Sequence, residues 1–178
     1  MTSEQSSEQD SEPGTEPGTE PGTEQSSGPA PRILADAALS DFLGERQFGT
    51  LATVKRDGHP HLTTMVYSWD PEERIVRFST TADRLKVRQI RNNPRVALHV
   101  SSDDHWTFAV VEGEAELSEP SAVAGDAVGR ELLTLLPAAA RPKDPADEAG
   151  FLARQVAERR LVIRLRVGKL YGTALDIT

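Results

Sequence analysis

Six short segments of alternating or β-branched apolar residues, separated by turn signals, constrain the fold of this chain most. Asp57-Gly58 is typical of tight hairpin turns, and Asp70-Pro71 closes the second segment. The predicted strands are residues 48–54, 61–69, 74–79, 95–100, 106–117 and 161–167. They do not alternate with helices as the strands of a doubly wound parallel sheet do. The pattern therefore predicts a mainly β fold, an antiparallel barrel or tightly rolled sheet with flanking helices.

Helical periodicity is predicted at four places along the chain. These are residues 33–44, a short segment after residue 83, and residues 121–136 and 146–159. Thr81 or Asp83 is expected to cap the short helix, and Asn92-Asn93-Pro94 to end it. Neither the glycine fingerprint of a Rossmann turn nor a phosphate loop of the GxxxxGK type occurs.

The first 30 residues differ sharply from the remainder of the chain. They contain seven carboxylates without any Lys or Arg, and Glu-Pro-Gly-Thr occurs three times in residues 12–23. Such a segment has no apolar side chains to bury, so we expect residues 1–30 to be a disordered acidic tail. A solubilising tail or spacer is the favoured interpretation over a docking peptide. Residues 31–178 are expected to form one folded domain.

Charge and composition exclude several classes of protein. Removing the seven tail carboxylates from the 28 acidic residues leaves 21 against 20 basic ones, a net charge of −1. A general nucleic-acid binder usually carries a basic surplus. The absence of cysteine removes disulfides, thiolate metal sites and cysteine nucleophiles. Without a long apolar run or a signal peptide, the expected location is the cytoplasm, with no membrane partner.

The most unusual stretch is residues 79–95. Three hydroxyl residues, Ser79, Thr80 and Thr81, precede a short helix that carries five cations and no acid from residue 84 on. A helix N-terminus presents free N–H groups, and Arg84 and Lys86 lie close enough to it to converge on one anion. A plain solvated surface helix is the equally weighted alternative, although first-turn cations oppose the helix dipole.

Other candidate residues give weaker signals. His59 and His61 lie two residues apart and would share one face of a strand, but no carboxylate motif accompanies them, so no metal site is predicted. No Ser-His-Asp pattern or nucleophile elbow is present, and no catalytic residue is assigned. Trp106 and Phe108 are expected in the core unless an aromatic cofactor lies beside them.

The order and spacing of eight motifs together resemble the pyridoxamine 5'-phosphate oxidase-like flavoproteins. The motifs are residues 49–54, 57–62, 69–70, 75–79, 84–97, 110–115, 160–164 and 169–172. The chain is most similar to the actinobacterial branch that uses the deazaflavin coenzyme F420, and the resemblance covers residues 34–174. It implies an antiparallel split β-barrel of the FMN-binding type, a homodimer with two cofactor sites at the subunit interface.

The resemblance also implies which residues bind the cofactor. The turn after the third strand would hold its phosphate and acidic tail, through Ser79, Thr80, Thr81, Arg84 and Lys86. The second strand would line the ring, through His61, Thr63, Thr64 and Met65. Trp106 and Phe108 would close the site or reach it from the partner subunit.

The implied function is hydride transfer between F420 and an unsaturated small-molecule acceptor. Two alternatives share the same fold: an FMN-dependent reductase or oxidase, and a non-catalytic protein that binds F420 or FMN. Nucleic-acid binding by the basic helix is a further alternative, disfavoured by the near-neutral body.

Overall fold

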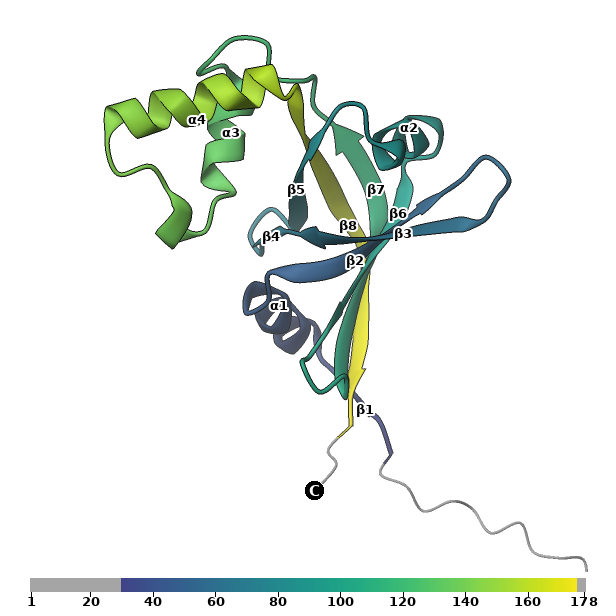
Figure 1. The fold of residues 1–178 in the computed structure, drawn as a ribbon. Coiled ribbons are helices and arrows are strands. Elements are labelled where there is room, and N and C mark those ends of the chain that lie inside the picture. Colours follow the sequence, from purple (N-terminus) through teal and green to yellow (C-terminus); the bar gives the residue numbers. More distant parts are fainter. Residues whose placement is uncertain (1–29, 176–178) are drawn as a thin grey trace, which may run out of the picture.

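A strongly curled antiparallel sheet forms the centre of the protein, as a computed structural model of residues 30–175 shows (Figure 1). The strands follow the order β3-β2-β6-β7-β8-β5-β4, and β1 pairs with β8. This mainly β half-barrel confirms the predicted fold class. The predicted acidic tail lies outside the described residues, apart from residue 30.

The elements are bounded as follows. The strands are β1 (Arg32–Ile33), β2 (Phe48–Val54), β3 (Pro60–Val66), β4 (Ser68–Asp70), β5 (Ile75–Thr81), β6 (Arg95–Ser101), β7 (Thr107–Leu117) and β8 (Arg160–Ala174). The helices are α1 (Asp36–Gly44), α2 (Leu85–Asn92), α3 (Ala127–Thr134) and α4 (Pro145–Ala157), with a 3₁₀ turn at Ala138–Ala140. No helix in this part of the chain combines the length and apolar character needed to cross a bilayer.

The hydrophobic core lies on the concave side of the sheet. Alternate residues of the central strands point inward, among them Leu51, Phe78 and Ile163, which are fully buried. The helices α1 and α2 cover this face with Leu43 and Val87. By contrast, α3 and α4 form a separate layer beside β5 and β8 (Figure 1).

The prediction for the last strand was wrong in length. Residues 161–167 were expected, whereas β8 continues to Ala174. Gly168 and Gly172 discourage a strand prediction, yet β8 passes through both, and Gly172 lets two backbones approach closely. A Cβ atom on Gly172 would lie 2.0 Å from the carbonyl oxygen of Phe108 on β7. Glycine in this strand therefore marks close packing, not a strand end.

Three other predicted boundaries also differ from the structure. The predicted second strand is interrupted at Tyr67, whose backbone N–H donates to Gln47 and whose hydroxyl donates to Leu43. The first helix begins at Asp36, because residues 32–33 pair with β8 instead. Residues 121–126 form a loop ahead of α3, held by Asp126.

Asp126 makes the stability of this loop and of α3 depend on pH. The N–H of Gly129, followed by those of Ala122 and Val123, lowers its pKa from 3.8 to about 2. A carboxylate with a depressed pKa stabilises the fold above pH 3.8, and this contribution is lost as the pH falls toward 2. Asp126→Ala should lower the free energy of unfolding by about 1 kcal/mol at pH 7. Urea unfolding measured at pH 7 and at pH 2.5 should show the difference shrinking at the lower pH.

Candidate cofactor site

A hydrogen-bonded strip joins β2, β3 and α2 on the concave face. The Oε1 atom of Gln89 accepts from the Thr53 hydroxyl at 2.7 Å and lies 2.8 Å from Nδ1 of His61. Because Oε1 is an acceptor, Nδ1 of His61 carries the proton, and Nε2 is the nitrogen left for another partner. This contact turns the predicted ring-binding residue His61 toward α2.

The N-terminus of α2 has no side-chain cap, so the predicted cap was wrong. Arg84 occupies the N-cap position, and no described side chain accepts from the first N–H groups. Thr81 still belongs to β5, and its hydroxyl donates to Asp83 at 2.5 Å. That hydrogen bond lowers the pKa of Asp83 and occupies one of its oxygens. The free N–H groups leave this helix end open to an anion.

Lys86 is a buried cation in the first turn of the same helix. It is only 8% exposed, and its side chain makes no hydrogen bond or ion pair with any of residues 30–175. Burial, and then the positive charge of Arg84, lowers its pKa. Lys86 precedes Gln89 and Ile90 by three and four positions and so shares their inward face. A buried lysine without an acidic partner is costly unless an anion binds beside it.

Thr63 gives a second sign of a ligand-binding site. It alternates with His61 and Met65 on the concave face of β3, and its Oγ1 atom is buried without a hydrogen-bond partner in the described chain. Buried hydroxyls are normally satisfied. The orphan hydroxyl and the unpaired Lys86 therefore fit a ligand that offers both polar atoms and negative charge.

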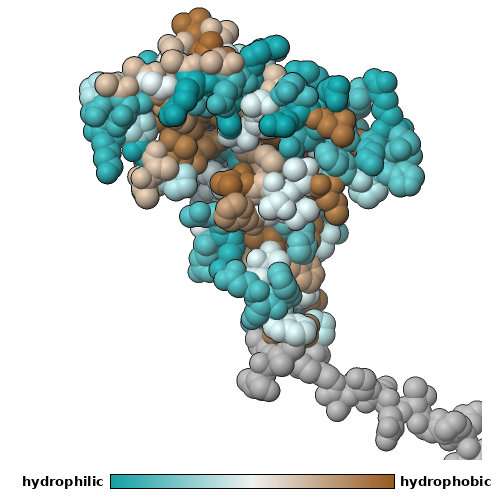
Figure 2. All heavy atoms as spheres, viewed as in Figure 1, coloured by the Kyte–Doolittle hydropathy of each residue, from teal (hydrophilic) through white to brown (hydrophobic). Residues whose placement is uncertain are grey.

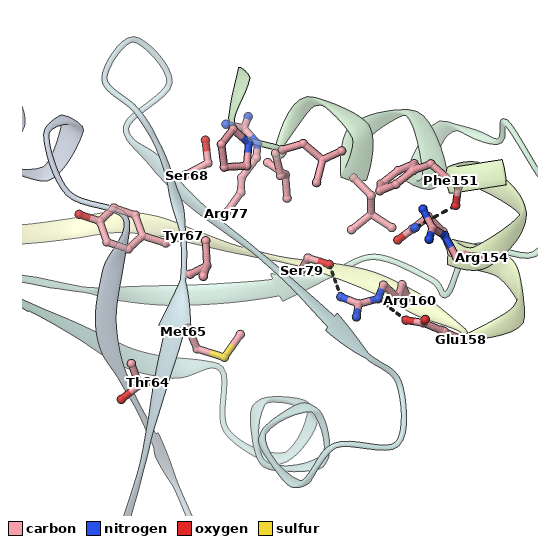
Figure 3. Close-up of a pocket in the computed structure, with 16 residues that line it drawn as sticks. Thr64, Met65, Tyr67, Ser68, Arg77, Ser79, Phe151, Arg154, Glu158 and Arg160 are labelled. Atoms are coloured by element: carbon pink, nitrogen blue, oxygen red, sulfur yellow. Dashed lines mark hydrogen bonds and ion pairs between the residues drawn. The ribbon is translucent and has the colours of Figure 1, made fainter. Parts of the chain in front are cut away.

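A cavity of about 510 Å³ opens between these strands and the helical layer (Figure 3). Thr64 and Met65 of β3 and Ser79 of β5 line one side of it. Figure 3 shows Phe151 and Arg154 on α4 facing them across the cavity. In Figure 2 hydrophobic residues gather below α4, bordered by hydrophilic ones. This is a pocket with an apolar interior and a polar rim, as ligand sites commonly are.

A second cavity, of about 490 Å³, lies beside the first. Thr81, Arg84, Arg159 and Arg160 line it, together with Asp83 and Glu158. Arg160 and Glu158 border both cavities. The guanidinium of Arg160 donates to Ser79 Oγ at 3.0 Å and to Glu158 at 2.7 Å, which lowers the pKa of Glu158. Together the two cavities offer room for a ring at one end and cationic groups at the other.

Arg159 and Arg160 were not among the predicted site residues. Arg159 follows α4 with a φ of 50°, the left-handed conformation that glycine usually adopts after a helix. This conformation is unusual for a residue other than glycine and often marks a functional site, but the sequence alone does not reveal it. Arg160 lies beside Thr81 through the pairing of β5 with β8, a long-range contact that the local pattern does not reveal.

The structure distributes the predicted residues over four places. Thr64, Met65 and Ser79 line the larger cavity, and Thr81 and Arg84 the smaller one. The concave face holds His61, Thr63, Thr80 and Lys86. Trp106 and Phe108 lie apart from both cavities, at the turn and start of β7, where Phe108 stacks on His99. Trp106 is 47% exposed, so its expected place in the core was wrong. Their role at the cofactor therefore stays a prediction that needs a second copy.

Comparisons with known proteins agree with this geometry. A family model described as pyridoxamine 5'-phosphate oxidase matches residues 35–173. The F420H2-dependent biliverdin reductase of Mycobacterium tuberculosis is 29% identical over 142 residues, which is 79% of this chain and 89% of that protein. A solved F420 reductase is 31% identical, with a TM-score of 0.52, covering 72% of this chain and 92% of the other. A conserved hypothetical protein of Mycobacterium tuberculosis shares the fold, with a TM-score of 0.64 at 23% identity, over 85% and 90% of the two chains.

Proposed function

This chain belongs to the pyridoxamine 5'-phosphate oxidase family, and we propose that it is an oxidoreductase that uses coenzyme F420. The reaction would be hydride transfer between F420 and an unsaturated small molecule. The observation that carries the proposal is the open N-terminus of α2 beside the buried, unpaired Lys86. The similarity to a biliverdin reductase and an F420 reductase favours the deazaflavin over FMN.

The charge distribution favours a ligand that is anionic over part of its length. F420 carries a phosphodiester and a glutamate tail, whereas FMN has a single phosphate. Near Lys86, the smaller cavity is lined by Arg84, Arg159 and Arg160, which outnumber its two carboxylates, Asp83 and Glu158. Arginine can hold phosphate or carboxylate oxygens through two parallel hydrogen bonds. A site of this extent fits the longer anion.

When bound, reduced F420 supplies the hydride, and the chain has to bind, orient and shield the ring. Met65 would pack against the ring, and the buried Thr63 hydroxyl would hydrogen-bond a ring heteroatom. Gln89 fixes His61 so that its Nε2 is free to exchange a proton. No covalent nucleophile is needed for this chemistry, so no Ser-His-Asp arrangement is required.

The test is equilibrium binding of F420 and of FMN to the purified protein, measured side by side. We expect F420 to bind at least tenfold more tightly than FMN, because it presents more negative charge to the cationic cavity. Oxidation of reduced F420 with biliverdin, quinone or nitro acceptors then separates an enzyme from a cofactor-binding protein. Tighter binding of FMN, or no binding of F420, would contradict the proposal.

We further propose that the protein is a homodimer that forms through the convex face of the sheet. Phe48, Leu62 and Val66 are large apolar residues that are about half exposed or more on β2 and β3. Trp106, in the turn directly before β7, is also exposed. A second copy would cover these residues and bring Trp106 and Phe108 to the neighbouring cofactor, as the resemblance implies.

Leu62→Glu combined with Val66→Glu should break this dimer. Two carboxylates per subunit would be buried in an apolar interface, and we expect the dimer dissociation constant to rise at least 100-fold. Sedimentation velocity at several concentrations measures the change. Val123→Glu, at an exposed apolar residue in the loop ahead of α3, serves as the control. A wild-type protein that sediments as a monomer at all concentrations would refute the dimer.

A further inference from the structure

The helical wall of the larger cavity carries side chains that the proposed cofactor residues do not use. This wall consists of Leu132, Leu135, Leu136 and Pro137 from the α3 side and Phe151, Arg154 and Gln155 from α4. It faces β3 and Ser79 across the cavity (Figure 3). Because it is predominantly apolar, a flat hydrophobic molecule could lie against it while the strand side holds another ligand.

Gln155 provides a buried polar group in this wall. Its side chain is 5% exposed, and its Nε2 atom donates to the carbonyl of Phe151 at 2.9 Å. Its Oε1 atom has no hydrogen-bond partner among the residues that the structure describes. An accessible, unpartnered amide oxygen at a cavity is suited to accept from an N–H or O–H group of a ligand.

Arg154 provides a charge that no acid neutralises through a hydrogen bond. Of the three arginines that line the cavity, Arg77 binds Asp70, Glu73 and Glu131, and Arg160 binds Glu158. The Arg154 guanidinium makes no hydrogen bond or ion pair with the described chain, and the Glu158 carboxylate, one turn further on, interacts with it only through the charge. It remains available to a carboxylate of a bound molecule.

We infer that this helical wall binds the hydride acceptor, and that Arg154 selects acceptors that carry a carboxylate on a flat, apolar ring system. The apolar side chains would pack on the rings, Gln155 would accept one hydrogen bond, and Arg154 would bind the acid at the rim. This inference rests on the proposed reductase function, since it divides the cavity between a coenzyme on the strand side and its acceptor on the helix side.

The experiment compares anthraquinone-2-carboxylate with its methyl ester, which keeps the rings and removes the charge. Equilibrium dialysis of the cofactor-free, full-length protein measures both affinities. We expect the acid to bind about five- to tenfold more tightly than the ester, because Arg154 is on the rim and partly screened by solvent. The preference should fall as salt is raised from 20 to 500 mM.

Arg154→Gln should abolish this preference by weakening the acid and leaving the ester unchanged. Arg91→Gln is the matched control, because Arg91 is also an exposed cation in the last turn of a helix but lines no part of this cavity. The inference is wrong if the wild-type protein binds acid and ester equally, or if Arg154→Gln weakens both alike.

Turnover distinguishes this inference from the proposed function. If reduced F420 is oxidised by the ester as efficiently as by the acid, the reductase proposal stands and the carboxylate selection is refuted. If F420 does not bind, yet the acid preference persists and depends on Arg154, the reductase proposal falls and the wall remains a carboxylate-binding site.

Discussion

Replacing both Arg84 and Lys86 by alanine should weaken F420 binding by about 100-fold or more while the protein stays folded. A hydrogen bond between charged groups contributes about 1.5–3 kcal/mol, which corresponds to roughly tenfold or more for each contact. Lys86 should account for most of the loss, because only 8% of this residue is exposed, whereas Arg84 is exposed. Fluorescence titration of F420 measures the affinity.

The same double variant should not lose stability. Lys86 has no acidic partner in the described chain, so its removal takes away a buried charge without leaving another unpaired. Urea unfolding should therefore show an equal or slightly higher midpoint. Arg88→Ala with Arg91→Ala is the control, since these exposed cations lie later in α2. An unchanged F420 affinity in the Arg84 and Lys86 variant would remove the proposed phosphate site.

The part of the candidate site that was proposed from the sequence depends on local chemistry. Hydroxyl residues that lead into a short basic helix are adjacent in the chain, so their meeting needs no long-range contact. The structure accordingly places Thr81 and Arg84 on one cavity and buries Lys86. The misassigned cap has a local cause too, because β5 extends two residues further than predicted and takes Thr81 with it.

The parts that the sequence did not reveal depend on tertiary contacts. Phe151 and Arg154 look like ordinary residues of an amphipathic helix until α4 is placed against β5 and β8. Arg160 joins Ser79 only because β8 returns beside β5, 81 positions along the chain. A local pattern cannot show which helix face borders a cavity. The apolar residues of an amphipathic helix have the same spacing whether they pack in the core or line a binding site.

The glycines of β7 and β8 illustrate the same limit for the fold. Gly113 lies at an irregularity in the pairing of β7 with β8, and a Cβ atom there would lie 1.8 Å from the carbonyl oxygen of Arg166. In the sequence Gly172 lies beyond the predicted last strand, whereas Gly113 lies inside the predicted strand at residues 106–117. In the structure they are the positions at which two neighbouring backbones come closest.

Gly172→Ala should therefore destabilise the protein severely, by about 3 kcal/mol or more. The added Cβ atom would lie 2.0 Å from the carbonyl oxygen of Phe108 and 2.8 Å from a methyl carbon of Leu39. Because the nearest atom belongs to the backbone of a paired strand, no side-chain rotation can relieve the contact. Loss of a soluble folded protein on expression, or a much lower urea midpoint, is the expected result.

Gly150→Ala is the matched control for this substitution. Gly150 lies within α4, and nothing surrounds the position of its Cβ atom within 4 Å. Alanine should raise the free energy of unfolding by about 0.5–1 kcal/mol, since it restricts the unfolded chain and favours a helix. The two variants add the same methyl group and should shift the urea midpoint in opposite directions. Equal midpoints for Gly172→Ala and the wild-type protein would show that β7 and β8 are not packed as closely as the structure places them.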